Sequence, residues 1–95
     1  LAKDLWLRNA RHANEMAQRL AEGARAVDGV RLLYPVQANA VFARLPHDVT
    51  ERLQKRFRFY FWDEAAGDVR WMCSFNTTEA DVDAFVAALK EEIAR

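Results

Sequence analysis

The stretch Val69–Thr78, VRWMCSFNTT, decides how the rest of the chain is interpreted. Its first part is rich in β-branched, aromatic and sulfur-containing side chains, which favours a strand, and it ends in helix-capping residue types. We therefore expect a strand that runs directly into a helix. Arg70 near the head of the strand is the exception, because a guanidinium keeps its charge and must reach water or bind an anion.

The residues just before this stretch predict a β-hairpin. FRFYFW from Phe57 is typical of a strand, DEAAGD of a hairpin connection with Gly67 at a positive φ, and Val69–Phe75 of the partner strand. Both strands carry apolar side chains on both faces, whereas a sheet with one solvated face alternates apolar and polar residues. We therefore expect the second face to be an interface with another domain or subunit.

Two more strands are predicted upstream. VRLLY from Val30 is a short strand that Pro35 ends, because proline lacks the N–H that a strand ladder needs. NAVFARL from Asn39 is the next strand. Its alternation places two sets of side chains on opposite faces: Ala40, Phe42 and Arg44 on one, and Val41, Ala43 and Leu45 on the other.

A long helix is predicted at the start of the chain. Side chains that recur at steps of three and four form one mostly alanine face, which allows a neighbouring element to approach closely: Trp6, Ala10, Ala13, Ala17, Leu20, Ala24 and Val27. Asp28-Gly29 is the stop signal, with Gly29 in the left-handed region.

Two further helices complete the expected fold. Residues 46–55 form a short helix that opens at a proline, and the last helix follows a capping frame of either Asn76 with Glu79 or Thr78 with Asp81. The order α-β-β-α-β-β-α predicts an α+β domain, in which a small, mainly antiparallel sheet has helices on one face.

Composition bounds the class of protein. The 95 residues are 52% apolar and carry 14 basic and 14 acidic side chains, which predicts one modest core and no nucleic-acid partner. No apolar run approaches the roughly 18 residues of a membrane span, so we expect no membrane partner. A single cysteine excludes an internal disulfide and is typical of a reducing, cytoplasmic compartment.

The first residues bear on whether the chain is part of a longer protein. The chain begins at Leu1 without an initiator methionine and is already in helical phase. We therefore expect residues 1–95 to be a single domain cut from a longer protein, with N-terminal processing as the alternative.

Few side chains indicate catalysis within the chain itself. His12 and His47 have no ligand partner at metal spacing and are expected at the surface, and Cys73 is expected to be a buried, inert thiol. No metal site and no nucleophile–base pair is predicted.

Two charged segments have a functional and a structural interpretation. Asp63, Glu64 and Asp68 crowd the hairpin, where acidic residues of a solvated turn are commoner than an acid–base pair. KRFRFYFW interleaves basic and aromatic residues like a single-strand nucleic-acid platform, but balanced charge favours a core strand flanked by solvated cations.

Arg70 leaves two interpretations open on spacing alone. It shares a strand face with Met72 and Ser74. It is either an edge arginine that reaches water or pairs with Asp68 or Asp63, or a fork aimed across an interface at a carboxylate or phosphate.

The ordered set of segments resembles a known family over essentially the whole chain. QANAVFARL, WDEAAGDVRWMCSF and TTEADVDAFV are similar to the C-terminal small domain of threonine aldolases, within the β-eliminating lyase group of pyridoxal-phosphate enzymes of the aspartate aminotransferase fold type. None of the three is a fingerprint by itself.

The resemblance implies a lyase, an aldolase that cleaves β-hydroxy-α-amino acids to glycine and an aldehyde with pyridoxal 5′-phosphate as electron sink. It implies that a large N-terminal domain holds the cofactor, that Arg70 binds the substrate carboxylate, and that the enzyme is a homo-oligomer. One departure affects the exact substrate and the exact subfamily, because Ser74 stands where the family often has histidine.

The chain alone is expected to be inactive and to bind no cofactor. Lys3, Lys55 and Lys90 lie in polar helical settings, unlike a desolvated Schiff-base lysine. The alternative function is a non-catalytic ligand-binding or regulatory module with a ferredoxin-like arrangement.

Overall fold

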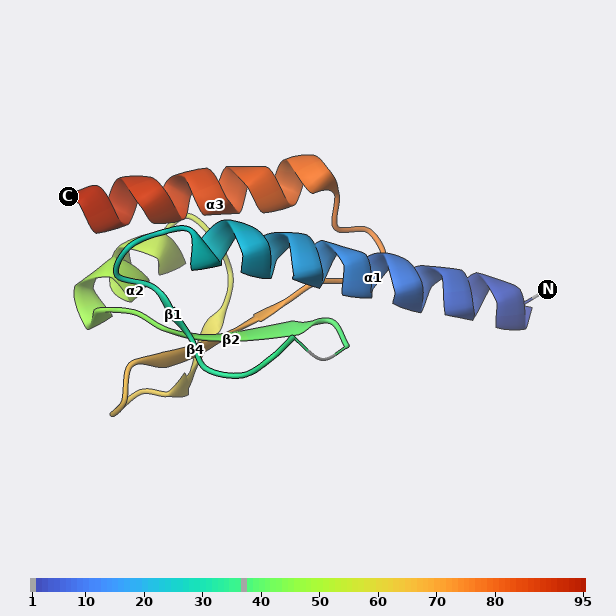
Figure 1. Ribbon diagram of the computed structural model, residues 1–95, viewed down its shortest axis with the longest axis horizontal. Coiled ribbons are helices and arrows are strands. Elements are labelled where there is room, and N and C mark those ends of the chain that lie inside the picture. Colours follow the sequence, from blue (N-terminus) through green and yellow to red (C-terminus); the bar gives the residue numbers. More distant parts are fainter. Residues whose placement is uncertain (1, 37) are drawn as a thin grey trace.

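The computed structural model describes residues 2–36 and 38–95. Within these residues the elements are α1 Ala2–Arg25, β1 Arg31–Leu32, β2 Ala40–Arg44, α2 His47–Gln54, β3 Tyr60–Asp63, β4 Asp68–Met72 and α3 Glu79–Ala94. The strands form one antiparallel sheet in the order β1-β2-β4-β3. The helices lie on one side of this sheet (Figure 1). The predicted α+β class and element order are confirmed.

Alternation along the two central strands decides which face of the sheet is buried. Val41 and Ala43 of β2 and Val69 and Trp71 of β4 are at most 3% exposed and point toward the helices. Their neighbours Phe42 and Arg70 face the other way and are cross-strand partners. The expected split of β2 into a buried and an outer face is confirmed.

Helices α1 and α3 pack closely over the buried face. Ala17, Ala21 and Ala24 of α1 are fully buried, and a Cβ added at Gly23 would lie 2.8 Å from Cγ2 of Val86 on α3. The alanine face therefore allows the close approach that its sequence predicts. None of the described helices is long and apolar enough to cross a bilayer.

The start of α1 departs from the predicted buried stripe. Trp6 is 67% exposed, and Leu5 and Leu7 beside it are also exposed. The first turns of α1 extend past the end of the sheet (Figure 1), so no described element covers them. Trp6 belongs to the predicted apolar stripe, but it is left as exposed apolar surface at the start of α1.

Both strands of the C-terminal hairpin are shorter than predicted. Pairing on β3 begins at Tyr60 rather than Phe57, because the ring of Phe57 packs edge-on against Phe85 of α3 with centroids 5.0 Å apart. Strand β4 ends at Met72, and the N–H of Ser74 then donates to Thr77 Oγ1 at 2.9 Å in a turn.

Only one of the two predicted capping frames begins α3. Thr78 Oγ1 accepts a hydrogen bond from the Asp81 N–H at 3.0 Å, and the Asp81 carboxylate accepts one from the Thr78 N–H at 2.9 Å. This reciprocal capping box satisfies N–H groups that have no partner within the helix. Gly29 and Gly67 adopt the expected positive φ values of 95° and 81°.

Replacing Thr78 with alanine is expected to lower the free energy of unfolding by about 1 kcal/mol, because the cap oxygen is lost. Thr78→Ser keeps the hydroxyl and is the matched control. Its free energy of unfolding is expected to change by only a few tenths of the change in Thr78→Ala. Urea denaturation of both variants measures the difference. Equal stability of the alanine and serine variants would contradict the capping role.

A buried carboxylate joins α2 to α3. Glu92 is 4% exposed, and three guanidinium groups donate to its carboxylate: those of Arg52 at 2.9 Å, Arg95 at 3.1 Å and Arg56 at 3.2 Å. Desolvation raises the pKa of Glu92, whereas the hydrogen bonds from these arginines lower it. The lowering is the larger effect, so the net pKa lies below its ordinary value.

We expect this network to make stability depend on pH in the acid range. Because the folded pKa of Glu92 is depressed, its contribution is present above the unfolded pKa and is lost as pH falls through the folded value. Glu92→Gln should therefore be less stable than the wild type at pH 7 and should lose less stability below about pH 4.5.

The matched control is Glu91→Gln, because Glu91 pairs with Arg56 at the solvent-exposed surface. Thermal unfolding of the wild type and both variants between pH 3 and pH 7 measures the effect. If Glu92→Gln lost as much stability at acidic pH as the wild type, Glu92 would not be the source of this pH dependence.

Candidate functional site

The outer face of the sheet is the side opposite the helices, and we define it by the side chains of Tyr34, Phe42, Tyr60, Trp62, Arg70 and Met72. Tyr34, Tyr60, Trp62 and Met72 are each more than half exposed. No described helix covers this face (Figure 1), although its side chains are mostly apolar or aromatic. The predicted second apolar face is confirmed as a feature of the sheet.

Arg70 lies at the centre of the outer face. It is the cross-strand partner of Phe42 on one side and of Tyr60 on the other. Its side chain is exposed, and within residues 2–36 and 38–95 no carboxylate lies within ion-pair distance of its guanidinium. Of the alternatives left open by the sequence, pairing with Asp68 or Asp63 does not occur.

The contact that Arg70 makes instead is with an aromatic ring. Its guanidinium carbon lies 5.1 Å from the centroid of the Trp62 ring, within the range of a cation–π interaction. The register of β3 against β4 shifts between Phe61 and Asp63, so Trp62 is the extra residue of a β-bulge. A bulge changes the direction of a side chain, and here the indole contacts Arg70.

A hollow of about 290 Å³ opens beside Arg70 at the edge of the sheet. Two arginines, Arg58 and Arg70, line it together with aromatic residues and Met72, and no acidic residue lines it. Two cations beside apolar walls favour an anion with a small apolar body. The sequence interpretation missed Arg58, which alternation along Arg58, Tyr60 and Trp62 would have placed on the outer face.

The acidic hairpin does not form a three-residue solvated cluster. Asp63 and Glu64 are exposed as expected, but Asp68 is only 7% exposed. Arg44 donates to both carboxylate oxygens of Asp68, from Nε at 2.7 Å and from Nη2 at 3.4 Å. This hydrogen bond raises the pKa of Arg44. The prediction for Asp68 is wrong, because a cross-strand arginine compensates for its burial.

The histidines have structural partners. His12 of α1 is half-buried, and its Nε2 lies 2.6 Å from the carbonyl oxygen of Thr77, so it ties α1 to the turn before α3. His47 is exposed as expected and contacts the Glu64 carbonyl through its Nε2. The prediction of a solvated His12 is wrong, because the turn before α3 places the Thr77 carbonyl beside α1.

Cys73 and Ser74 lie at the end of β4. Cys73 is 3% exposed as predicted, and burial raises the pKa of its thiol, which favours the inert protonated form. Ser74 is exposed beyond the strand, where its hydroxyl contacts Asn76. Ser74 therefore belongs to the turn and does not line the hollow beside Arg70.

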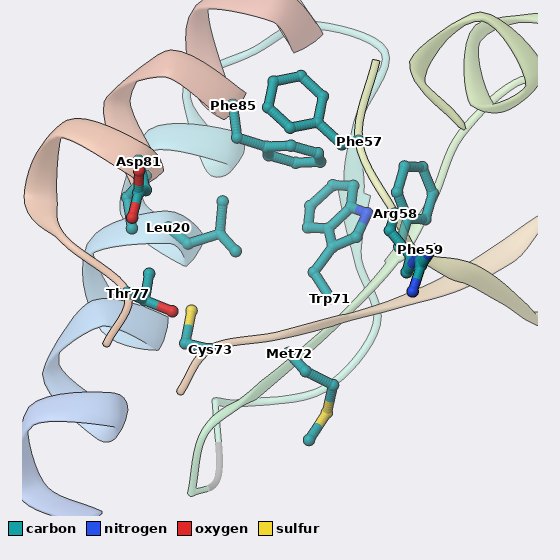
Figure 2. A pocket seen from close by; sticks show the side chains of 11 residues that line it. Leu20, Phe57, Arg58, Phe59, Trp71, Met72, Cys73, Thr77, Asp81 and Phe85 are labelled. Carbon is teal, nitrogen blue, oxygen red and sulfur yellow. The ribbon is translucent and has the colours of Figure 1, made fainter. Parts of the chain in front are cut away.

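A second hollow, of about 180 Å³, lies between the sheet and α3 (Figure 2). Trp71 and Cys73 point toward α1 and α3, whereas Met72 points away from the other side of the strand (Figure 2). The two hollows share Arg58, Phe59 and Met72 at the sheet edge, but Arg70 lines only the outer one. The candidate site is therefore the outer hollow.

The settings of the lysines and of the metal-binding residue types bear on whether this chain could hold pyridoxal phosphate or a metal ion. Lys3, Lys55 and Lys90 are all exposed, so none has the desolvated setting of a Schiff-base lysine. No group of three or more His, Cys, Asp or Glu side chains that could hold a metal ion occurs among the described residues.

The sequence of this chain is similar to that of known enzymes. No protein-family model matches the chain. It is 41% identical over 86 residues to the low specificity L-threonine aldolase of Pseudomonas sp. (strain NCIMB 10558), covering 90% of this chain and 25% of that protein. The Pseudomonas aeruginosa enzyme of the same name is 46% identical over 78 residues, 81% of this chain and 22% of that protein.

The chain is homologous to part of the low specificity L-threonine aldolases. It spans about a quarter of the length of these relatives. The solved structure of Leishmania major threonine aldolase superimposes with a TM-score of 0.73 at 31% identity, over 84% of this chain and 24% of that one. The resemblance to threonine aldolases that the sequence suggested is thereby confirmed.

Because the outer face is apolar and uncovered, we expect the 95-residue chain to self-associate as its concentration rises. Tyr60→Lys combined with Met72→Lys should shift the equilibrium toward monomer, since two charges would then have to be desolvated. Ala84→Lys, on the exposed side of α3, is the control. Sedimentation equilibrium measures the dissociation constant, and a wild-type chain that stays monomeric would contradict the expectation.

Proposed function

We propose that this chain is the C-terminal small domain of a pyridoxal-phosphate-dependent aldolase, which cleaves β-hydroxy-α-amino acids to glycine and an aldehyde. In this proposal the chain supplies the arginine that binds the substrate carboxylate and one side of a domain interface. The homology to threonine aldolases supports the reaction class.

The observation that carries the proposal is the state of Arg70. Its guanidinium is exposed on an uncovered face and has no acidic partner among the described residues, so its N–H groups are available to a ligand. A planar guanidinium donates two parallel hydrogen bonds to a carboxylate, which fixes the orientation of the amino acid as well as its position.

The neighbours of Arg70 suit the same ligand. Arg58 adds a second positive charge to the hollow, which strengthens attraction of an anion. Tyr60, Trp62 and Met72 provide apolar surface, and a partner domain placed over them would exclude water from the ion pair. Exclusion of water strengthens the hydrogen bonds between the guanidinium and the carboxylate.

The cofactor belongs to the part of the protein outside this chain. When bound, pyridoxal 5′-phosphate supplies the electron sink for the carbanion chemistry. Lys3, Lys55 and Lys90 are all exposed, so in this proposal the Schiff-base lysine and the phosphate site lie elsewhere, and we assign no step of the chemistry to this chain. Its own contribution is to bind and orient the substrate.

Two uncovered apolar surfaces lead us to propose two partners. The first is an N-terminal large domain of the same polypeptide, which covers the outer face and holds the cofactor. The second is another copy of the enzyme, because the exposed Leu5, Trp6 and Leu7 at the start of α1 offer further apolar surface. We place this enzyme in the cytoplasm, in line with its buried, unpaired Cys73.

A non-catalytic ligand-binding module is the alternative. A small antiparallel sheet with helices on one face occurs in proteins of many functions. The fold alone therefore does not distinguish the enzyme domain from the binding module. The identity of 41–46% to threonine aldolases favours the enzyme. Ser74 lies in a turn outside the hollow and has no role in this proposal.

In the full-length enzyme, Arg70→Ala is expected to raise KM for L-threonine by roughly ten- to several-hundred-fold, because a charged hydrogen-bonded pair is lost. Arg70→Lys should not restore it, since an ammonium lacks the planar fork. Arg25→Ala, at the last turn of α1, is the control. Steady-state kinetics with cofactor absorbance and circular dichroism measure these effects. Normal KM in a correctly folded Arg70→Ala enzyme would refute the role.

A further inference from the structure

A row of three aromatic rings ends at Arg70 on the outer face. The rings of Tyr34 and Phe42 meet edge-to-face with centroids 5.5 Å apart, and those of Phe42 and Trp62 do so at 5.2 Å. The guanidinium carbon of Arg70 then lies 5.1 Å from the Trp62 centroid. Edge-to-face contacts at these distances are favourable and depend on orientation, so each ring restricts the next.

The row is anchored in the most constrained part of the sheet. Phe42 lies in the middle of β2, where it pairs with Arg70 of β4 and its carbonyl accepts a hydrogen bond from the Leu33 N–H at 3.0 Å. Trp62 has no cross-strand partner of its own because of the bulge. Its ring orientation therefore depends on Phe42 on one side and Arg70 on the other.

We propose that Trp62 is a positioning residue for Arg70, which holds the guanidinium ready for the substrate carboxylate. This inference rests on the proposed role of Arg70 as carboxylate ligand. In a stacked cation–π contact the guanidinium presents its face to the ring, and its N–H edges then remain available to a carboxylate. Trp62 thus restricts the side chain without occupying the donors that bind the substrate.

Arg44 on the same sheet shows the contrast. Its guanidinium is fixed by two hydrogen bonds to Asp68, and these occupy the donors that a carboxylate ligand would need. Arg70 is held by a ring and has no acidic partner in residues 2–36 and 38–95. The two arginines therefore differ in the property that matters for binding, which is whether the donor edge is free.

Pre-orientation of Arg70 has a defined kinetic consequence. An exposed arginine samples many rotamers, and a ligand that binds one of them must overcome the loss of the others. Loss of the Trp62 ring should therefore weaken substrate binding while the reacting atoms, which lie outside this chain, keep their rate. The effect is expected on KM rather than on kcat.

The test uses the full-length enzyme with L-threonine. Trp62→Leu should raise KM about three- to tenfold and change kcat less than about twofold, whereas Trp62→Phe, which keeps a ring face, should stay within about twofold of the wild type. In an Arg70→Ala background, Trp62→Leu should have no further effect on KM. Trp62→Met serves if Trp62→Leu does not fold, as judged by circular dichroism and cofactor absorbance.

The outcomes separate this inference from the proposed function. If Arg70→Ala raises KM but Trp62→Leu does not, or raises it equally in the Arg70→Ala background, Trp62 has no positioning role and the function of Arg70 stands. If Arg70→Ala leaves KM unchanged, the proposed function fails, and the positioning role fails with it. A fall in kcat with unchanged KM in Trp62→Leu would also overturn the inference.

Discussion

The alternation of side chains along β4 is the constraint on which the rest of this structure depends. Val69 and Trp71 point to the helices and complete the buried core, whereas Arg70 and Met72 point to the opposite face. β4 is a central strand, with β2 on one side and β3 on the other, so its register sets both faces of the sheet. A slip of one residue would bury the guanidinium and expose Trp71.

The same constraint explains why the outer face has a dual character. It is apolar enough to need covering, yet its central residue is a permanent cation, which is costly to bury without an anion. A surface of this kind suits a site that is closed by another part of the protein and filled by an anionic ligand. The hollow beside Arg70, with two arginines and no acid, has that character.

Local sequence signals predict the elements and the face of each strand well. Alternation in NAVFARL and VRWMC places the buried residues correctly, and Thr78 with Asp81 forms one of the two capping frames that were expected. The positive φ values predicted for Gly29 and Gly67 are also observed. Each of these features depends on neighbours within a few residues, which the sequence displays directly.

The features that the sequence does not predict depend on contacts between distant segments. Phe57 leaves the expected strand because Phe85 of α3 offers an aromatic partner, and His12 is half-buried because the chain returns to it at Thr77. Asp68 is buried because Arg44 on another strand pairs with it. Tertiary partners override local preference in all three cases.

The candidate site also combines features that local sequence predicts with features that depend on distant contacts. Alternation places Arg70 on the outer face, but it does not reveal that Asp68 is already bound to Arg44 and so does not compete for Arg70. The contact between Trp62 and Arg70 is likewise not visible in the sequence, because it depends on how β3 registers against β4 at the bulge. Periodicity gives the direction of a side chain, whereas the state of its donors requires the three-dimensional structure.

A crystal structure of the full-length protein with glycine bound at its active site tests the central claim most directly. We expect both carboxylate oxygens of glycine to accept hydrogen bonds from the Arg70 guanidinium, the Trp62 ring to lie against that guanidinium, and another part of the protein to cover the outer face. A glycine carboxylate held by other residues, with Arg70 facing bulk solvent on an uncovered sheet, would contradict the account.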